Sequence, residues 1–169
     1  GPWQEIQMET TYYDTPGRTL SARHITLRRR MENGKSVCTL KTPSDGNGRG
    51  EWECACDRIE HAIEELCKLG APENLKELTA VGIQEVCGAK FHRIAKTVSL
   101  PEGVVELALD RGVLTGGGKE VPLCEVEVEL KSGEPEAAVA FATALAEQFG
   151  LKPQKRSKFR RALQLAKEE

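Results

Sequence analysis

Aromatic residues are scarce in this chain. They make up 5% of its 169 residues, so aliphatic side chains have to supply most of any hydrophobic core. Charged residues account for 30% and hydrophobic residues for 39%, which is typical of a globular protein. The length fits one domain, and we expect that domain to span residues 1–169.

Long apolar runs, a secretion signal and an excess of basic charge are also missing. Without a run of about 18 apolar residues, the sequence predicts no membrane-spanning helix and no association with a membrane. The net charge of −2 and the pI near 6.0 differ from the basic surface of a general nucleic-acid binder. These absences remove two broad classes of partner.

The six cysteines show no Cys-x-x-Cys spacing. Four of them fall at apolar positions of expected strands, where a free thiol behaves as a small hydrophobic group. We therefore interpret them as structural, in preference to zinc ligands or disulfides, and this interpretation fits a cytoplasmic protein.

Carboxylates alternate with valine in residues 125–129. A strand points successive side chains to opposite faces, so Glu125, Glu127 and Glu129 share one face. Carboxylates about 7 Å apart along a strand repel each other unless a cation or basic groups lie between them. The row therefore predicts half of a site for a divalent metal and a polyanion.

Basic side chains alternate in the same way earlier in the chain. Two expected strands, 25–31 and 36–42, are joined by an Asn-Gly turn, which is the best short signal for a hairpin. Their charged faces should adjoin, and the basic residues on those faces are Arg28, Arg30 and Lys41.

Two further expected strands, 50–57 and 103–111, carry ions on one face and apolar groups on the other. The ionic residues are Arg49, Glu51 and Glu53 on the first strand, and Glu106 and Asp110 on the second. Additional strands are expected over 4–13, 90–99 and 120–130, and amphipathic helices over 58–69, 73–87 (with a break near Gly82), 134–149 and 156–168.

The simplest interpretation of any one such strand is a solvated face, because a half-exposed antiparallel sheet alternates in this way. The separation of the charges by sign instead favours a ligand-binding surface. A solvent-facing surface tends to mix positive and negative side chains, and a cluster of one sign costs energy unless a ligand neutralises it. We therefore predict an α+β fold. It would be an antiparallel β-barrel, or tunnel, of seven to eight strands, with a charged lumen and the helices packed outside. Its acidic side would hold Mg²⁺ or Mn²⁺, and its basic side would hold phosphate oxygens.

Several motifs together resemble the CYTH domain, or triphosphate tunnel metalloenzyme, family. They cover nearly the whole chain in the family's order. The matching stretches are Tyr-Tyr-Asp-Thr-Pro at 12–16, Leu-Arg-Arg-Arg at 27–30, Thr-Leu-Lys at 39–41, Arg-Gly-Glu-Trp-Glu at 49–53, Phe-His-Arg at 91–93, Glu-Leu-Ala-Leu-Asp at 106–110, the segment 125–133 and Ser-Lys at 157–158.

The resemblance implies a tunnel that binds a triphosphate and a divalent metal, and it is greatest to bacterial inorganic triphosphatases. Family members hydrolyse inorganic triphosphate, thiamine triphosphate or RNA 5′-triphosphate ends, or cyclise ATP. By position, the resemblance implies that phosphates are held by Arg28, Arg30, Lys41, Arg49, Arg93, Lys158 and, one helical turn later, Arg161. Glu125, Glu127 and Glu129 would bind metal. The inward carboxylates Glu106 and Asp110 would order basic groups or hold a second metal, and Glu51 or Glu53 would act as general base.

One departure concerns the family's Glu-x-Glu-x-Lys strand near the N-terminus. Residues 4–9 do not match it, because position 11 is Thr11, and they directly precede the motif of the second strand. We therefore expect this chain to be without the first strand and its helix, and not to be fully active. The open sheet edge would then allow a homodimer.

Three alternatives to a metal-dependent triphosphatase stay open at this point. A class IV-type adenylyl cyclase or a thiamine triphosphatase would use the same tunnel on a substrate with an organic part. A non-catalytic module could retain polyphosphate or nucleotide without turnover. A solvated α+β domain would bind no polyphosphate.

Overall fold

A computed structural model describes residues 2–43 and 50–167. The strands are β1 (Gln4–Asp14), β2 (Thr26–Glu32), β3 (Lys35–Lys41), β4 (Glu51–Ala55), β5 (Gln84–Leu100), β6 (Gly103–Gly116) and β7 (Lys119–Gly133). The helices are α1 (Thr19–Ala22), α2 (Ile59–Lys68), α3 (Asn74–Leu78), α4 (Pro135–Phe149) and α5 (Lys158–Lys167). No helix in these ranges is long and apolar enough to cross a membrane.

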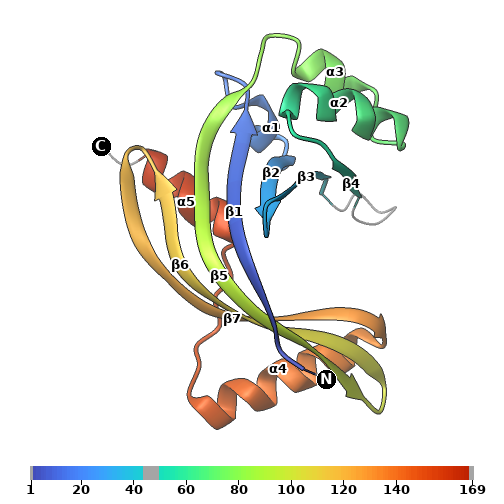
Figure 1. Cartoon of the computed structure of the whole chain (residues 1–169), viewed down its shortest axis with the longest axis vertical. Helices are drawn as coiled ribbons and strands as arrows, with labels where there is room; N and C mark the ends of the chain where they lie inside the picture. The colour runs from blue at the N-terminus through green and yellow to red at the C-terminus, as the bar shows by residue number, and fades with distance from the viewer. Residues whose placement is uncertain (1, 44–49, 168–169) are drawn as a thin grey trace.

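The seven strands form one antiparallel sheet in the order β4-β3-β2-β1-β5-β6-β7. The sheet curls strongly, with β5, β6 and β7 as its longest strands (Figure 1). The α+β class and the curled tunnel confirm the prediction. The sheet is not closed, because β4 and β7 are its two edges and do not pair in the described parts of the chain.

The expected hairpin between β2 and β3 is present. Asn33 and Gly34 have φ angles of 50° and 84°, which is the pair of left-handed conformations that a tight two-residue hairpin turn requires. The turn sets Arg28 opposite Thr39 and Thr26 opposite Lys41. Lys41 therefore shares the Arg28 face, as the alternation indicated.

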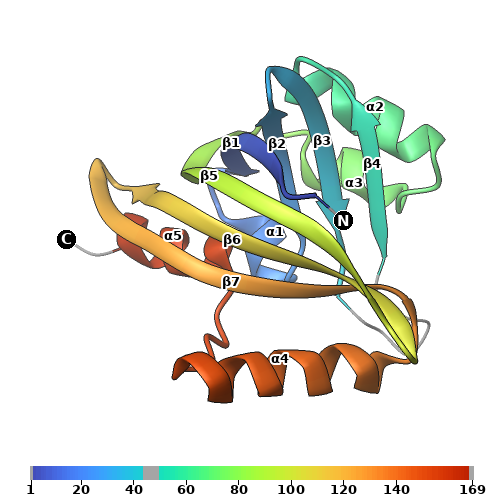
Figure 2. The same cartoon turned by 60° about the horizontal axis from the view of Figure 1, so that its bottom comes forward.

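Helices α1, α2 and α3 lie at the β2–β4 end of the sheet (Figures 1 and 2). The core there contains Leu27, Leu40 and Trp52 from the strands with Ile63 and Leu66 from α2. This is the apolar face, opposite Arg28 and Lys41. The helix expected over 73–87 is wrong beyond residue 78: α3 is five residues long, and β5 starts at residue 84. Pairing of β5 with β1 outweighs the weak helical pattern.

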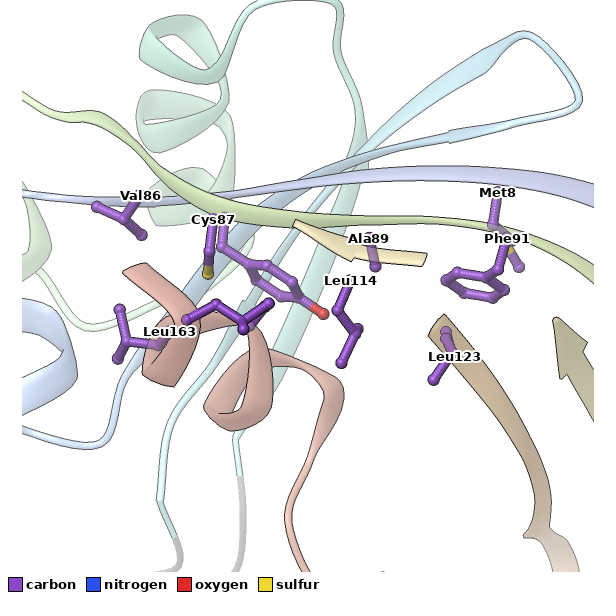
Figure 3. Close-up of a cluster of buried hydrophobic side chains, with 11 residues drawn as sticks. Met8, Val86, Cys87, Ala89, Phe91, Leu114, Leu123 and Leu163 are labelled. Atoms are coloured by element: carbon purple, nitrogen blue, oxygen red, sulfur yellow. The ribbon is translucent and has the colours of Figure 1, made fainter. Parts of the chain in front are cut away.

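Helix α4 packs along β7 and β6, and Gly150 ends it with a φ of 65° (Figure 2). Helix α5 differs from the expectation that the helices lie outside. It packs against the same face of the sheet that carries the ions, in a core with Met8, Ala89, Phe91 and Leu114 (Figure 3). The inner face is therefore apolar at the end that α5 covers and ionic beyond it.

Candidate active site

The strand register brings charged residues from distant parts of the chain into rows on the inner face. Arg93 on β5 is the direct partner of Asp110 on β6, which is the partner of Glu125 on β7. Glu127 and Glu129 follow on the same face of β7, and Glu129 lies opposite Glu106. The acidic row therefore has a second acidic strand beside it.

Three of these carboxylates converge. Oxygen atoms of Asp110, Glu125 and Glu127 lie within 4.8 Å of one another, and we call these residues the acidic trio. The ammonium group of Lys158, in the first turn of α5, lies among them. Its Nζ is 2.8 Å from Asp110 Oδ2, 2.5 Å from Glu125 Oε1 and 2.6 Å from Glu127 Oε1.

Two arginines surround the acidic trio. Arg93 donates to both oxygens of Asp110, at 2.7 and 2.8 Å, and to Glu127 at 3.1 Å. Arg161, one turn after Lys158, donates to Glu125 at 2.6 Å. The paired hydrogen bonds to Asp110 are the charge-assisted geometry that fixes an arginine most firmly.

In Asp110, Glu127 and Lys158, burial and ion pairing shift the pKa values in opposite directions. Burial alone would raise the pKa of Asp110 and Glu127, but the cations of Arg93 and Lys158 lower both. Burial would lower the pKa of Lys158, whereas Glu127, Asp110 and Glu125 raise it. All three groups are therefore held in their charged forms at neutral pH.

The basic half of the inner face is different, because two of its arginines form no ion pair with a carboxylate of the described residues. Within residues 2–43 and 50–167, Arg30 makes one hydrogen bond, from Nε to Thr10 Oγ1 at 2.8 Å. The Nε of Arg28 is buried without a partner there. Burial and the charge of Arg28 lower the pKa of Arg30 to about 10, so it stays charged at neutral pH. Cations of this kind attract an anionic ligand.

Lys41 continues the basic half. Its Nζ lies 3.5 Å from Glu51 Oε1, and both side chains are partly exposed. Burial and the charge of Arg28 lower the pKa of Lys41, while Glu51 raises it. Arg28, Arg30 and Lys41 therefore form one patch, as the sequence predicted.

Several predicted site residues lie away from the acidic trio. Glu51 and Glu53 are exposed on β4, the sheet edge opposite to β7, and within the described chain neither forms an ion pair or hydrogen bond with the trio. Glu129 is exposed and pairs with Lys131 at 3.4 Å. Arg49 lies outside the described residues.

The structure also adds residues that the sequence did not single out. Thr10 binds Arg30, and Phe91 lies beneath three cations of the site. The alternation of side chains along each strand predicts that both residues point to the inner face. Which cations they contact depends on the pairing register of the strands.

The acidic trio suits a hard divalent cation, because its oxygen donors come from two neighbouring strands and already enclose one positive group. Such a cation would compete with the Lys158 ammonium for the same oxygens. In the part of the chain that the structure describes, the arrangement therefore combines a place for a cation with two arginines that form no ion pair and can attract an anion.

A comparison with family sequence profiles decides the relationship: the CYTH domain matches residues 2–163. The chain belongs to the CYTH domain family. A relative, the inorganic triphosphatase of Haemophilus influenzae, is 29% identical over 146 residues. That alignment covers 84% of this chain and 41% of the relative, so the chain spans less than half the relative's length.

Solved structures show the same fold. A protein from Pyrococcus horikoshii is 24% identical with a TM-score of 0.60, covering 99% of this chain and 88% of that one. A candidate adenylate cyclase from Bacillus halodurans is 18% identical with a TM-score of 0.58, covering 92% and 82%. A Hippeastrum protein described as a candidate adenylyl cyclase with a dominant triphosphatase activity is 16% identical with a TM-score of 0.55, covering 93% and 81%. These likenesses support the CYTH tunnel architecture.

Proposed function

We propose that this CYTH domain hydrolyses the terminal phosphoanhydride of a triphosphate, with inorganic tripolyphosphate as substrate, in a metal-dependent reaction. The observation that carries the proposal is the inner face itself. It sets Arg28 and Arg30, which lack carboxylate partners in the described chain, on the same curled surface as the acidic trio. A polyanion with a bound divalent cation is complementary to both halves.

In this proposal the basic patch holds the non-transferred phosphates. Arg28 and Arg30 offer guanidinium donors to phosphate oxygens, and Lys41 supplies a third positive charge. Neutralising the phosphate chain and its leaving oxygen is the main requirement for phosphoryl transfer. Lys158 and Arg161 can turn from their carboxylates to phosphate oxygens when a substrate is present, while Arg93, which Asp110 holds in place, can offer its remaining donors.

The acidic trio, extended by Glu129 and Glu106, would hold Mg²⁺ or Mn²⁺. When bound, such a cation orients the phosphate chain and neutralises its charge. Asp110 also orients Arg93 through two hydrogen bonds, so it serves both halves of the site.

The proposed general base is Glu51 or Glu53. Both lie on the inner face of β4 in register with Lys41 and Thr39, so they border the basic patch and not the acidic trio. Both carboxylates are accessible to a water molecule at the open side of the tunnel and could accept its proton, and Lys41 lies 3.5 Å from that of Glu51.

We also propose that the chain is one domain and that a second copy can pair along the open edge of β4 or β7. Light scattering at several protein concentrations tests the pairing, because the fraction of the protein that is dimeric should rise with concentration.

The deciding experiment for function is a substrate panel. Tripolyphosphate, thiamine triphosphate and ATP are each supplied with Mg²⁺ and with Mn²⁺, and phosphate and cyclic AMP are measured. Phosphate release from tripolyphosphate supports the proposal. Cyclic AMP from ATP would indicate a cyclase, preferential hydrolysis of thiamine triphosphate a thiamine triphosphatase, and thermal stabilisation without turnover a binding module.

A further inference from the structure

Three cations of the site surround one aromatic ring. The guanidinium carbons of Arg30 and Arg93 lie 5.8 and 5.6 Å from the centroid of Phe91, and Lys158 Nζ lies 5.0 Å from it. These three are also the only cationic side chains that are buried in the described chain, with exposed fractions of 8%, 9% and 6%. In the described chain, all the buried positive charges therefore lie near the same aromatic ring.

The ring is held firmly in this place. Phe91 is 2% exposed and packs in the inner core with Met8 and Leu123 (Figure 3). Its register partner on β6 is Gly112, where an added Cβ would lie 2.0 Å from the carbonyl oxygen of Lys90 and 2.8 Å from Phe91 Cβ. The absence of a side chain at Gly112 therefore lets β5 and β6 approach closely beside the ring.

The three cations differ in what else neutralises them. Arg93 and Lys158 contact carboxylates of the acidic trio. Among the described residues, Arg30 donates to the Thr10 hydroxyl and lies over the ring, and the charge of Glu32 acts on it without forming an ion pair. The negative face of an aromatic quadrupole attracts cations, most strongly where water is excluded, so Phe91 offsets part of the repulsion among the three charges.

We propose that Phe91 is a positioning residue that holds the Arg30 guanidinium ready for a phosphate group before substrate arrives. This role rests on the proposed function, because the ligand in question is tripolyphosphate. Burial and the Thr10 hydrogen bond hold the Arg30 side chain at Nε, so the ring restrains the rest of the guanidinium, whose ordering would otherwise cost free energy on binding. The ring supplies that order in the ligand-free protein without competing with the phosphate for hydrogen-bond donors.

The first test compares Phe91→Leu with a matched control, Phe159→Leu. Phe159 packs on the same core from α5 and contacts Tyr12, with ring centroids 4.9 Å apart, and no cation contact to it is recorded in the described chain. Calorimetric titration with tripolyphosphate in the absence of metal should show about tenfold weaker binding for Phe91→Leu and unchanged binding for the control. Equal affinity in the two variants would overturn the proposal.

The second test separates ring charge from ring volume. Mono-, di- and trifluorophenylalanine at position 91 weaken the quadrupole step by step while nearly keeping the shape. The affinity for tripolyphosphate and the unfolding temperature of the ligand-free protein should both fall with each fluorine at 91 and stay level for the same series at 159. A flat series at 91 would show that the ring only packs, and would overturn the proposal.

Failure of the proposed function gives a different result. If the wild-type protein does not bind tripolyphosphate, the proposed function is contradicted. The unfolding temperatures of the ligand-free series then decide by themselves whether the Phe91 ring restrains the three cations, since that measurement needs no ligand.

Discussion

Lys158 and Glu127 are 31 residues apart in the chain, and the ammonium of the first donates to the carboxylate of the second at 2.6 Å. The same ammonium also contacts Asp110 and Glu125. Helix α5 therefore places a positive charge where the acidic trio would accept a divalent cation. The cationic side chains of the protein therefore neutralise the acidic trio, and a metal would compete with the Lys158 ammonium for the same oxygens.

Replacement of Lys158 by methionine should tighten metal binding. Without the ammonium, the trio keeps its three negative charges, and their mutual repulsion increases the affinity for a cation. We expect Lys158→Met to bind Mn²⁺ about tenfold more tightly in an electron paramagnetic resonance titration, which requires no turnover. Lys167→Met, at an exposed position of the same helix, is the control, and weaker binding by Lys158→Met would contradict this account.

Glu127→Gln should abolish metal-dependent phosphate release without unfolding the domain. The substitution removes one charge of the acidic trio but keeps the size of a half-exposed side chain, so the core is not disturbed. Glu120→Gln, on the opposite face of β7, should retain turnover. Retained phosphate release in Glu127→Gln, with an unchanged circular dichroism spectrum, would reject the role of Glu127.

Arg28→Ala should weaken the binding of tripolyphosphate by about 2–4 kcal/mol, the range for removing one partner of a charge-assisted contact that the bound ligand would bury. The neighbouring Arg29 points to the opposite face and donates to Ser36 at 2.8 Å, so Arg29→Ala is a control of equal charge. Calorimetry should show the loss for Arg28→Ala alone. An equal loss in both variants would mean that only net charge matters.

The stability of the metal-free protein should fall in acid. Burial raises the pKa of Asp110, but Arg93 and Lys158 together lower it by more. The pKa of Asp110 in the folded protein is therefore below its value in the unfolded chain. The resulting stabilisation is present above the unfolded pKa, near 4, and is lost as the pH falls through the folded value. Urea unfolding at decreasing pH should show this loss, and Asp110→Asn should show a shallower one. A wild-type free energy of unfolding that is constant below about pH 4 would contradict the pairing.

Gly112→Ala should destabilise the domain by about 2–4 kcal/mol, because its Cβ would meet the Lys90 carbonyl oxygen and the backbone of Phe91. Gly17→Ala is the control, since its Cβ would have one neighbour, at 4.0 Å. Denaturant midpoints of the two variants measure the difference. Equal midpoints would show that β5 and β6 can separate without cost.

Strand alternation was enough to place most of the charged residues on one face. Glu125, Glu127 and Glu129 share the inner face with Arg28 and Arg30, as period-2 spacing required. The apolar side chains on the opposite face determine the register of each strand, because shifting the pairing by one residue would move its charged side chains into the core. The separation of the two signs onto opposite ends of the sheet was also visible in the sequence.

The partners of each charge could not be predicted, because they depend on register and on α5. Alternation shows that Arg93 and Asp110 can face inward, but pairing of β5 with β6 makes them direct neighbours. The resemblance predicts that Lys158 binds phosphate, and only the packing of α5 shows that its ammonium also lies among three carboxylates. Phe91 looked like an ordinary core residue, since local sequence does not show that three distant cations meet its ring.

The most direct test of the central claim is a crystal structure of the protein with tripolyphosphate and Mn²⁺, with anomalous scattering used to locate the metal. We expect phosphate oxygens within hydrogen-bonding distance of Arg28 and Arg30, Mn²⁺ on the acidic trio, and Lys158 displaced from it. Phosphates bound on the outer face of the sheet, or Lys158 still enclosed by the three carboxylates beside a fully bound substrate, would contradict it.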